Sequence, residues 1–295
     1  MTSIPFHRAV FLPLALIVGG CSGTGFDPGL PAPKLDGTLL SVDLATGLAT
    51  AIAEDQAGTV ASGRLVVRKV EATTVALADG DAVAEANAPV AGTRRVNVAT
   101  CYLAVTELTQ GQWTALTTGT THHRTPWTRI VPADGAVPVT DGPNQPATGL
   151  DLILVTTVCA DWSSRRPFRL RLPSGGEWQA AAQGSDSPTY PWGDGLEEAD
   201  WKDTAHLRTT TGASTTGPSA GPLRVAQKQA KNGFYDLAGN VAELLGDERS
   251  GDLAVLVGGS WNDNPRSAAI RNRQTAPIGI PLATAGCRLV LEVTP

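Results

Sequence analysis

The stretch NGFYDLAGNVAE at residues 232–243 is the most informative part of this 295-residue chain. It is followed by VGGSW at residues 257–261 and by GCRLV at residues 286–290. Two further strings precede it, RLPSGGEW at residues 171–178 and YPWGD at residues 190–194. The last of these predicts a turn with stacked aromatic rings, because proline fixes φ and glycine permits the return. No single string decides the fold, and the prediction rests on their order and spacing.

In this order the strings resemble the formylglycine-generating enzyme (sulfatase-modifying factor) domain family. The resemblance covers about residues 64–293. It implies an α+β fold, a loop-rich variant of the C-type-lectin-like domain. It does not imply one function, because this fold carries both oxidases and pure binding proteins, so that function has to be argued from the site.

The N-terminus predicts export. Arg8 precedes an apolar run that ends at Cys21 in the string VGGC. The run has about 12 residues, which suits a signal peptide and is too short to span a bilayer. Small residues before a cysteine resemble a bacterial lipoprotein cleavage box, so we predict a signal peptide over residues 1–20 and lipidation of Cys21. The alternative is an ordinary signal peptide with Cys21 as an unmodified thiol.

These features place the mature protein in the bacterial cell envelope, held to a membrane by the lipid anchor on its outer-membrane or periplasmic face. Residues 21–36 are rich in glycine and proline and predict a flexible tether. Residues 37–63 predict a β extension packed on a main domain of residues 64–295, with a small separate module as the alternative. The chain has 28 acidic and 23 basic residues and no basic block, so we expect no nucleic-acid partner.

Local patterns predict two helix starts and one helix. Thr109 is expected to cap a helix, with the glutamine three residues later as its capping-box partner, and Ser174 is expected to cap the helix that carries Glu177 and Trp178. A further helix is expected over residues 152–162. Glu177 would then be buried and would need a partner, for which Arg171 or a loop amide is expected.

Three cysteines follow Cys21 in the sequence: Cys101, Cys159 and Cys287. An odd number of cysteines is unusual for an exported protein. The family resemblance implies a disulfide between Cys159 and Cys287, with Cys101 left unpaired. The alternative is three buried thiols, since cysteine is often a core residue.

A calcium site is implied by the resemblance at the Gly-Asn-x-x-Glu string. In the family, the asparagine and glutamate of this string hold calcium, here Asn240 and Glu243, and oxygen ligands suit this hard cation. The bulky aromatic residues that flank the family glutamate are replaced by Ala242 and Leu244. The alternative is that Asn240 closes a local turn and Glu243 pairs with an arginine.

The resemblance to the family does not extend to the residues that its enzymes use for catalysis. The family's oxidases bind copper through two cysteines shortly after the Gly-Gly-Ser-Trp string, at positions that fall here at about Asp263 and Ala268. Neither side chain replaces the thiolate that Cu(I) prefers, so no copper is expected. Iron-dependent relatives need a histidine triad, and the four histidines of this chain form no such cluster in the sequence. We therefore expect no enzyme, with a formylglycine-generating or related protein-maturation enzyme of non-standard active site as the alternative.

The polar segment after Trp261 resembles the ligand-binding face of retroelement-diversified variable proteins. The resemblance implies a protein or glycan ligand bound through the 262–274 face. Its candidate contact residues are Asn262, Asp263, Asn264, Ser267, Ile270, Asn272 and Gln274. Two alternatives stay open: the polar side chains can satisfy loop backbone, and the arginines of this segment can form ion pairs with Glu177 or Asp236.

Overall fold

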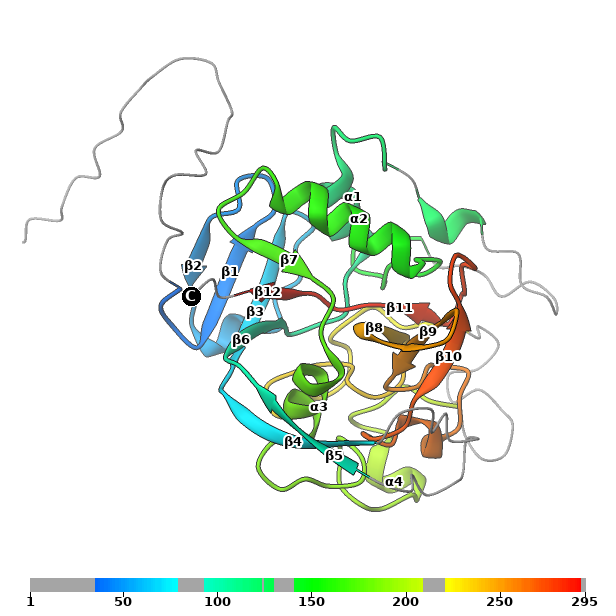
Figure 1. Cartoon of the computed structure of the whole chain (residues 1–295). Coiled ribbons are helices and arrows are strands. Elements are labelled where there is room, and N and C mark those ends of the chain that lie inside the picture. The colour runs from blue at the N-terminus through cyan, green and yellow to red at the C-terminus, as the bar shows by residue number, and fades with distance from the viewer. Residues whose placement is uncertain (1–34, 79–92, 124, 130–140, 209–220, 293–295) are drawn as a thin grey trace, which may run out of the picture.

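The computed structural model describes residues 35–78, 93–123, 125–129, 141–208 and 221–292 (Figure 1). The predicted signal peptide, the lipidation site Cys21 and nearly all of the tether lie outside the described residues. No described helix is long and apolar enough to cross a membrane.

A six-stranded antiparallel sheet forms the centre of the fold, in the order β2-β1-β3-β6-β12-β7. Its strands are β1 (Leu39–Asp43), β2 (Ala49–Ala51), β3 (Arg64–Val70), β6 (Cys101–Ala104), β7 (Arg169–Arg171) and β12 (Val290–Glu292). Strand β1 pairs with β3 over its whole length, from Leu39 opposite Arg68 to Asp43 opposite Arg64. The 37–63 segment thus extends the main sheet at one edge.

Both faces of this sheet are buried, and the two-residue period of each strand divides its side chains between them. Leu40 and Tyr102 point into one hydrophobic cluster, whereas Leu39 and Leu103 point into another. Helices α1 (Gln110–Thr117) and α2 (Leu152–Ser163) contribute to the first cluster, and α3 (Gly175–Gln183) contributes to the second. Figure 1 shows α1 and α2 on one side of the sheet and α3 on the other.

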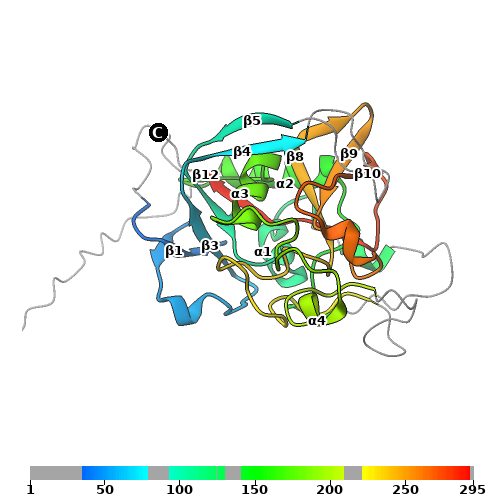
Figure 2. The same ribbon diagram turned by 90° about the horizontal axis from the view of Figure 1, so that it is seen from below.

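Two smaller sheets complete the described fold. One has the order β10-β9-β8-β11, and the other is a hairpin that packs on α3 (Figure 2). Their strands are β4 (Thr73–Ala78), β5 (Thr93–Val98), β8 (Ala242–Ser250), β9 (Leu253–Val257), β10 (Gln274–Pro277) and β11 (Ala285–Gly286). Strand β11 pairs in parallel with β8, with Gly286 opposite Glu243. This pairing brings together two of the strings that predicted the fold.

The short helices are α4 (Glu198–Trp201) and three 3-10 turns, η1 (Glu54–Gln56), η2 (Pro126–Arg129) and η3 (Pro265–Ala268). The predicted caps are confirmed: Thr109 accepts a hydrogen bond from the backbone N of Gln112, and Ser174 accepts one from the backbone N of Glu177. The predicted helix at 152–162 is confirmed as α2, and the stacked turn is confirmed by parallel rings of Tyr190 and Trp192, whose centroids are 4.6 Å apart.

The predicted disulfide is absent from the structure. Cys159 and Cys287 lie in the same hydrophobic cluster as free thiols, and Cys101 is a buried free thiol in the other cluster. Burial raises the pKa of the Cys159 thiol to about 12, and it also raises the pKa of Cys101 and Cys287. These side chains therefore pack as small protonated apolar groups, which is the alternative considered from the sequence.

Candidate ligand-binding site

A buried ion pair joins the strings that predicted the fold. The guanidinium of Arg288 donates to both carboxylate oxygens of Glu243, at 2.6 Å from Nε and 2.5 Å from Nη2. Trp178 Nε1 donates to the same carboxylate at 2.8 Å. Arg288 also donates to the backbone oxygens of Ala104 and Tyr235. Every charged group in this network thus has hydrogen-bonding partners, as a buried ion pair requires.

These contacts do not fit the calcium site predicted at Asn240 and Glu243. Both oxygens of Glu243 are taken by Arg288, whose positive charge would repel a cation. The Asn240 side chain donates to Glu107 at 2.6 Å and accepts from the backbone N of Leu223 at 2.8 Å. Across the described ranges, no three His, Cys, Asp or Glu side chains gather where they could hold a metal ion. The alternative of an arginine partner for Glu243 is what the structure shows.

Two further buried acids border this network. Glu107 was not predicted from the sequence, and Asp236 was considered only as an ion-pair partner for the arginines of the 262–274 segment. Glu107 is fully buried and accepts from the Val241 backbone N at 2.9 Å, while Asp236 accepts from the Ala226 backbone N at 2.7 Å. Burial and then the neighbouring carboxylates raise the pKa of Glu107, and burial raises that of Asp236 to about 6. Three carboxyl groups therefore share one guanidinium, a compact arrangement that favours protonation of Glu107 and Asp236.

The predicted 262–274 face contains a cavity of about 380 Å³. We call it the amide pocket. Its lining comes from β8, β9, β10 and the loops after β9 and β10: Ala242, Leu256, Ser260, Asn262, Asp263, Asn272, Arg273, Gln274, Thr275, Leu282 and Thr284. Four of the seven predicted contact residues thus come together in one place.

Some of the polar groups of the amide pocket hold the loop in shape. Asp263 Oδ2 accepts from the backbone N and the hydroxyl of Ser260, at 2.9 and 2.6 Å. Asn272 Nδ2 donates to the backbone oxygen of Ser267 at 2.8 Å. Arg273 is buried and pairs with Glu248 at 2.7 Å. An ion pair for this arginine was an alternative from the sequence, but its partner is neither Glu177 nor Asp236.

Other polar groups of the amide pocket are free to bind. In the described part of the chain, the side chains of Asn262, Gln274, Thr275 and Thr284 form no hydrogen bond; Asn262 is held only by its backbone N, which donates to the Ser260 hydroxyl at 3.3 Å. Asn262 is exposed, and the other three are partly exposed. The free groups are thus two amides and two hydroxyls, which all carry both donors and acceptors.

Three of the predicted contact residues lie elsewhere. Ser267 and Ile270 are buried, and Ile270 belongs to the hydrophobic cluster that contains Trp178. Ser267 lies in the 3-10 turn η3 and points inward. Because Ser267 and Ile270 are both buried, neither can contact a ligand in this conformation. Asn264 lines a separate cavity on the other side of the segment.

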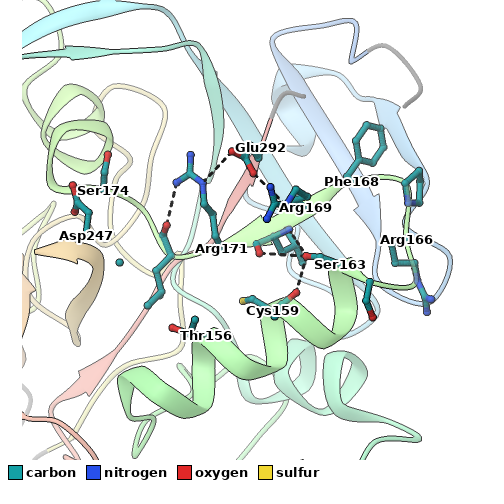
Figure 3. A pocket seen from close by; sticks show the side chains of 16 residues that line it. Thr156, Cys159, Ser163, Arg166, Phe168, Arg169, Arg171, Ser174, Asp247 and Glu292 are labelled. Atoms are coloured by element: carbon teal, nitrogen blue, oxygen red, sulfur yellow. Dashed lines mark hydrogen bonds and ion pairs between the residues drawn. The ribbon is translucent and has the colours of Figure 1, made fainter. Parts of the chain in front are cut away.

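A larger cavity of about 780 Å³ lies along α2 and β7 and was not predicted (Figure 3). Most of its charged groups are paired within the chain. Arg171 forms two hydrogen bonds with Glu177, at 2.8 and 2.7 Å, which confirms the partner expected for that buried glutamate. Arg169 and Arg171 also lie 3.7 and 3.9 Å from Glu292. Ser163 accepts from the Leu170 backbone N at 2.9 Å, so the outer edge of β7 is also occupied.

Comparison with known proteins places these features in a family. The model of the sulfatase-modifying factor enzyme 1-like domain matches residues 62–293. The chain belongs to this family. No curated protein matches the chain at a significant level.

Solved structures share the fold of this sulfatase-modifying-factor-like protein. Variable protein 1 of Treponema denticola is 20% identical with a TM-score of 0.60, over 77% of this chain and 95% of that one. PvdO from Pseudomonas aeruginosa is 21% identical with a TM-score of 0.60, over 78% and 95%. CarF is 18% identical with a TM-score of 0.55, over 78% and 99%. Identities this low support a common fold and leave function to the site.

Asp263 and Ala268 stand at about the positions where the resemblance places the copper-binding cysteines of family oxidases, and both have structural roles in this protein. Asp263 holds the turn at Ser260, and Ala268 is fully buried beneath it. No cysteine lines the amide pocket. The residues present therefore do not fit a copper-thiolate centre.

Proposed function

We propose that this member of the sulfatase-modifying factor family is a binding module that takes a protein or glycan ligand at the amide pocket. The observation that supports it most is the set of free polar side chains, Asn262, Gln274, Thr275 and Thr284, around a cavity that no cysteine lines. Amides and hydroxyls both donate and accept hydrogen bonds, so they match sugar hydroxyls or peptide groups. The contacts of the partly buried Asp263 and the buried Arg273 hold the loops in place, which reduces the entropy lost on binding.

We further propose that the protein works in the bacterial envelope, anchored by lipid at Cys21. The support is the apolar run and the small residues before that cysteine. In cells supplied with a labelled fatty acid, the wild type should incorporate the label and a Cys21→Ala variant should not. Absence of label from the wild type, or equal label in the variant, would remove the anchor from the proposal.

A screen of the full chain against arrays of glycans and of peptides tests the binding function. Ligands bound by the wild type should be lost by an Asn262→Ala/Gln274→Ala double variant. The matched control is Gln227→Ala, which removes an exposed amide that lines none of the cavities described above. Equal binding by the double variant would contradict the assignment of the amide pocket.

The alternative function is a protein-maturation enzyme, since the family includes enzymes. A second assay separates the two proposals: the chain is loaded with copper and mixed with a cysteine-containing peptide, and oxygen uptake is measured. Oxygen consumption above that of free copper would favour the enzyme and overturn the binding function.

A further inference from the structure

A second cavity, of about 520 Å³, shares the 262–266 segment with the amide pocket: Asn262 and Asp263 line the amide pocket, and the next three residues line the second cavity. We call it the charged pocket. Its lining residues are Leu196, Glu197, Glu198, Trp201, Asn264, Pro265 and Arg266. One wall therefore comes from α4 and the residues before it, and the other comes from the start of η3. Figure 2 shows α4 close to the orange turn that contains η3.

The inner wall of the charged pocket contains a buried donor without an acceptor. Trp201 is 2% exposed, and its Nε1 finds no hydrogen-bond acceptor among the described residues. The nearby Trp192 differs, because its Nε1 donates to the Gly195 backbone oxygen at 2.8 Å. Trp201 packs in a cluster with Tyr190 and Trp192, which restrains its ring. A buried N–H group without a partner is uncommon in folded proteins, and a ligand that accepts from it would explain its presence.

Opposite charges line the same cavity without meeting. Glu197 and Glu198 stand on the α4 wall and Arg266 on the other, and the ion pairs of the described residues include none of the three. Local structure restrains the backbone on the arginine side, where Asn264 Oδ1 accepts from the Arg266 backbone N at 2.9 Å. Pro265 stands at the first position of η3 and stiffens the same turn.

We propose that the charged pocket binds a zwitterionic ligand of the amino-acid class. The ligand carboxylate accepts hydrogen bonds from the Arg266 guanidinium and Trp201 Nε1, and its ammonium group faces Glu197 and Glu198. Its aliphatic part packs on Leu196 and Pro265. A simple anion would face two carboxylates, whereas a simple cation would leave Arg266 and the indole N–H unpaired. A ligand with both charges satisfies all of these groups at once.

Three probes with six-carbon chains test this assignment on the full chain by isothermal titration calorimetry. L-Norleucine carries both charges, hexanoate lacks the ammonium group and hexylamine lacks the carboxylate. We expect saturable binding of norleucine, with hexanoate and hexylamine at least tenfold weaker. Arg266→Gln and Glu198→Gln should each weaken norleucine binding at least tenfold, because each removes one charged partner from an exposed position. Trp201→Phe should also weaken it, because the phenyl ring lacks the indole N–H donor.

Arg271→Gln is the matched control, since Arg271 is exposed on the same segment but lines neither pocket. It should bind norleucine as the wild type does. Equal binding of hexanoate or of hexylamine would overturn the proposal, as would the absence of saturable norleucine binding or full affinity in Arg266→Gln. The Asn262→Ala/Gln274→Ala variant separates this site from the proposed function, because it should lose the ligand of the amide pocket and keep norleucine.

Discussion

Replacement of Asp236 by asparagine should remove a pH dependence from the stability of the protein. Asp236 is 4% exposed, and burial raises its pKa from 3.8 to about 6 in the folded state. A raised folded pKa means that the folded state binds the proton more tightly. Its contribution to stability is therefore complete below about pH 4 and is lost as pH rises through about 6.

The size of the effect follows from the shift. Two pKa units correspond to about 3 kcal/mol, because each unit is worth about 1.4 kcal/mol. Asparagine stays neutral, retains an oxygen for the Ala226 backbone N, and tolerates the left-handed φ of 54° at this position. Asp236→Asn should thus match the wild type near pH 4 and exceed its free energy of unfolding by up to about 3 kcal/mol at pH 8.

Thermal unfolding of both chains at pH 4, 6 and 8 measures this difference. A gain of about 3 kcal/mol corresponds to a rise in Tm of about 6–12 °C for a domain of this size. Asp252→Asn is the control, since it removes an exposed carboxylate from the turn between β8 and β9. A constant difference between Asp236→Asn and the wild type at all three pH values, or a gain at pH 4 instead, would refute the reasoning.

Three other outcomes are expected. Arg288→Met should lower the free energy of unfolding by about 3–5 kcal/mol in urea titrations, because it leaves Glu243 charged and buried without its partner; a loss below 1 kcal/mol would contradict this account. Ser174→Ala should cost about 1 kcal/mol in the same assay through loss of the α3 cap, and Ser174→Asp should restore most of it. A thiol reagent should leave Cys101, Cys159 and Cys287 unmodified in the native protein, because all three thiols are buried and have raised pKa values. The same reagent should label all three in denaturant. Labelling under native conditions would contradict their burial.

Helix starts were predictable from the sequence because their chemistry is local. Ser174 and Glu177 are three residues apart and satisfy each other's backbone groups, so the pattern alone contains the contact. The partner of Glu243 was not predictable in this way. Arg288 lies 45 residues further on and reaches it only through the parallel pairing of β11 with β8.

Only four of the seven residues predicted for the binding face line the amide pocket, because their burial also depends on the fold and does not follow from a sequence period. A strand or a long helix exposes residues at a fixed period, but the segment from Asn262 to Gln274 is a succession of turns and a short 3-10 helix. Burial in such a segment depends on each turn, so Ser267 and Ile270 could not be separated from Asn262 by their spacing. Glu107 was missed because the groups that it binds, Asn240 and the Val241 backbone N, lie more than 130 residues further along the chain.

The place of β12 in the central sheet has a consequence for how the protein is made. It lies between β6 and β7, and β7 joins the sheet only through it. Strand β12 follows every other described strand in the chain, yet it fills an interior position of the sheet. A nascent chain therefore cannot close its main sheet before β12 has been synthesised, and loss of β12 would split the sheet internally instead of trimming an edge.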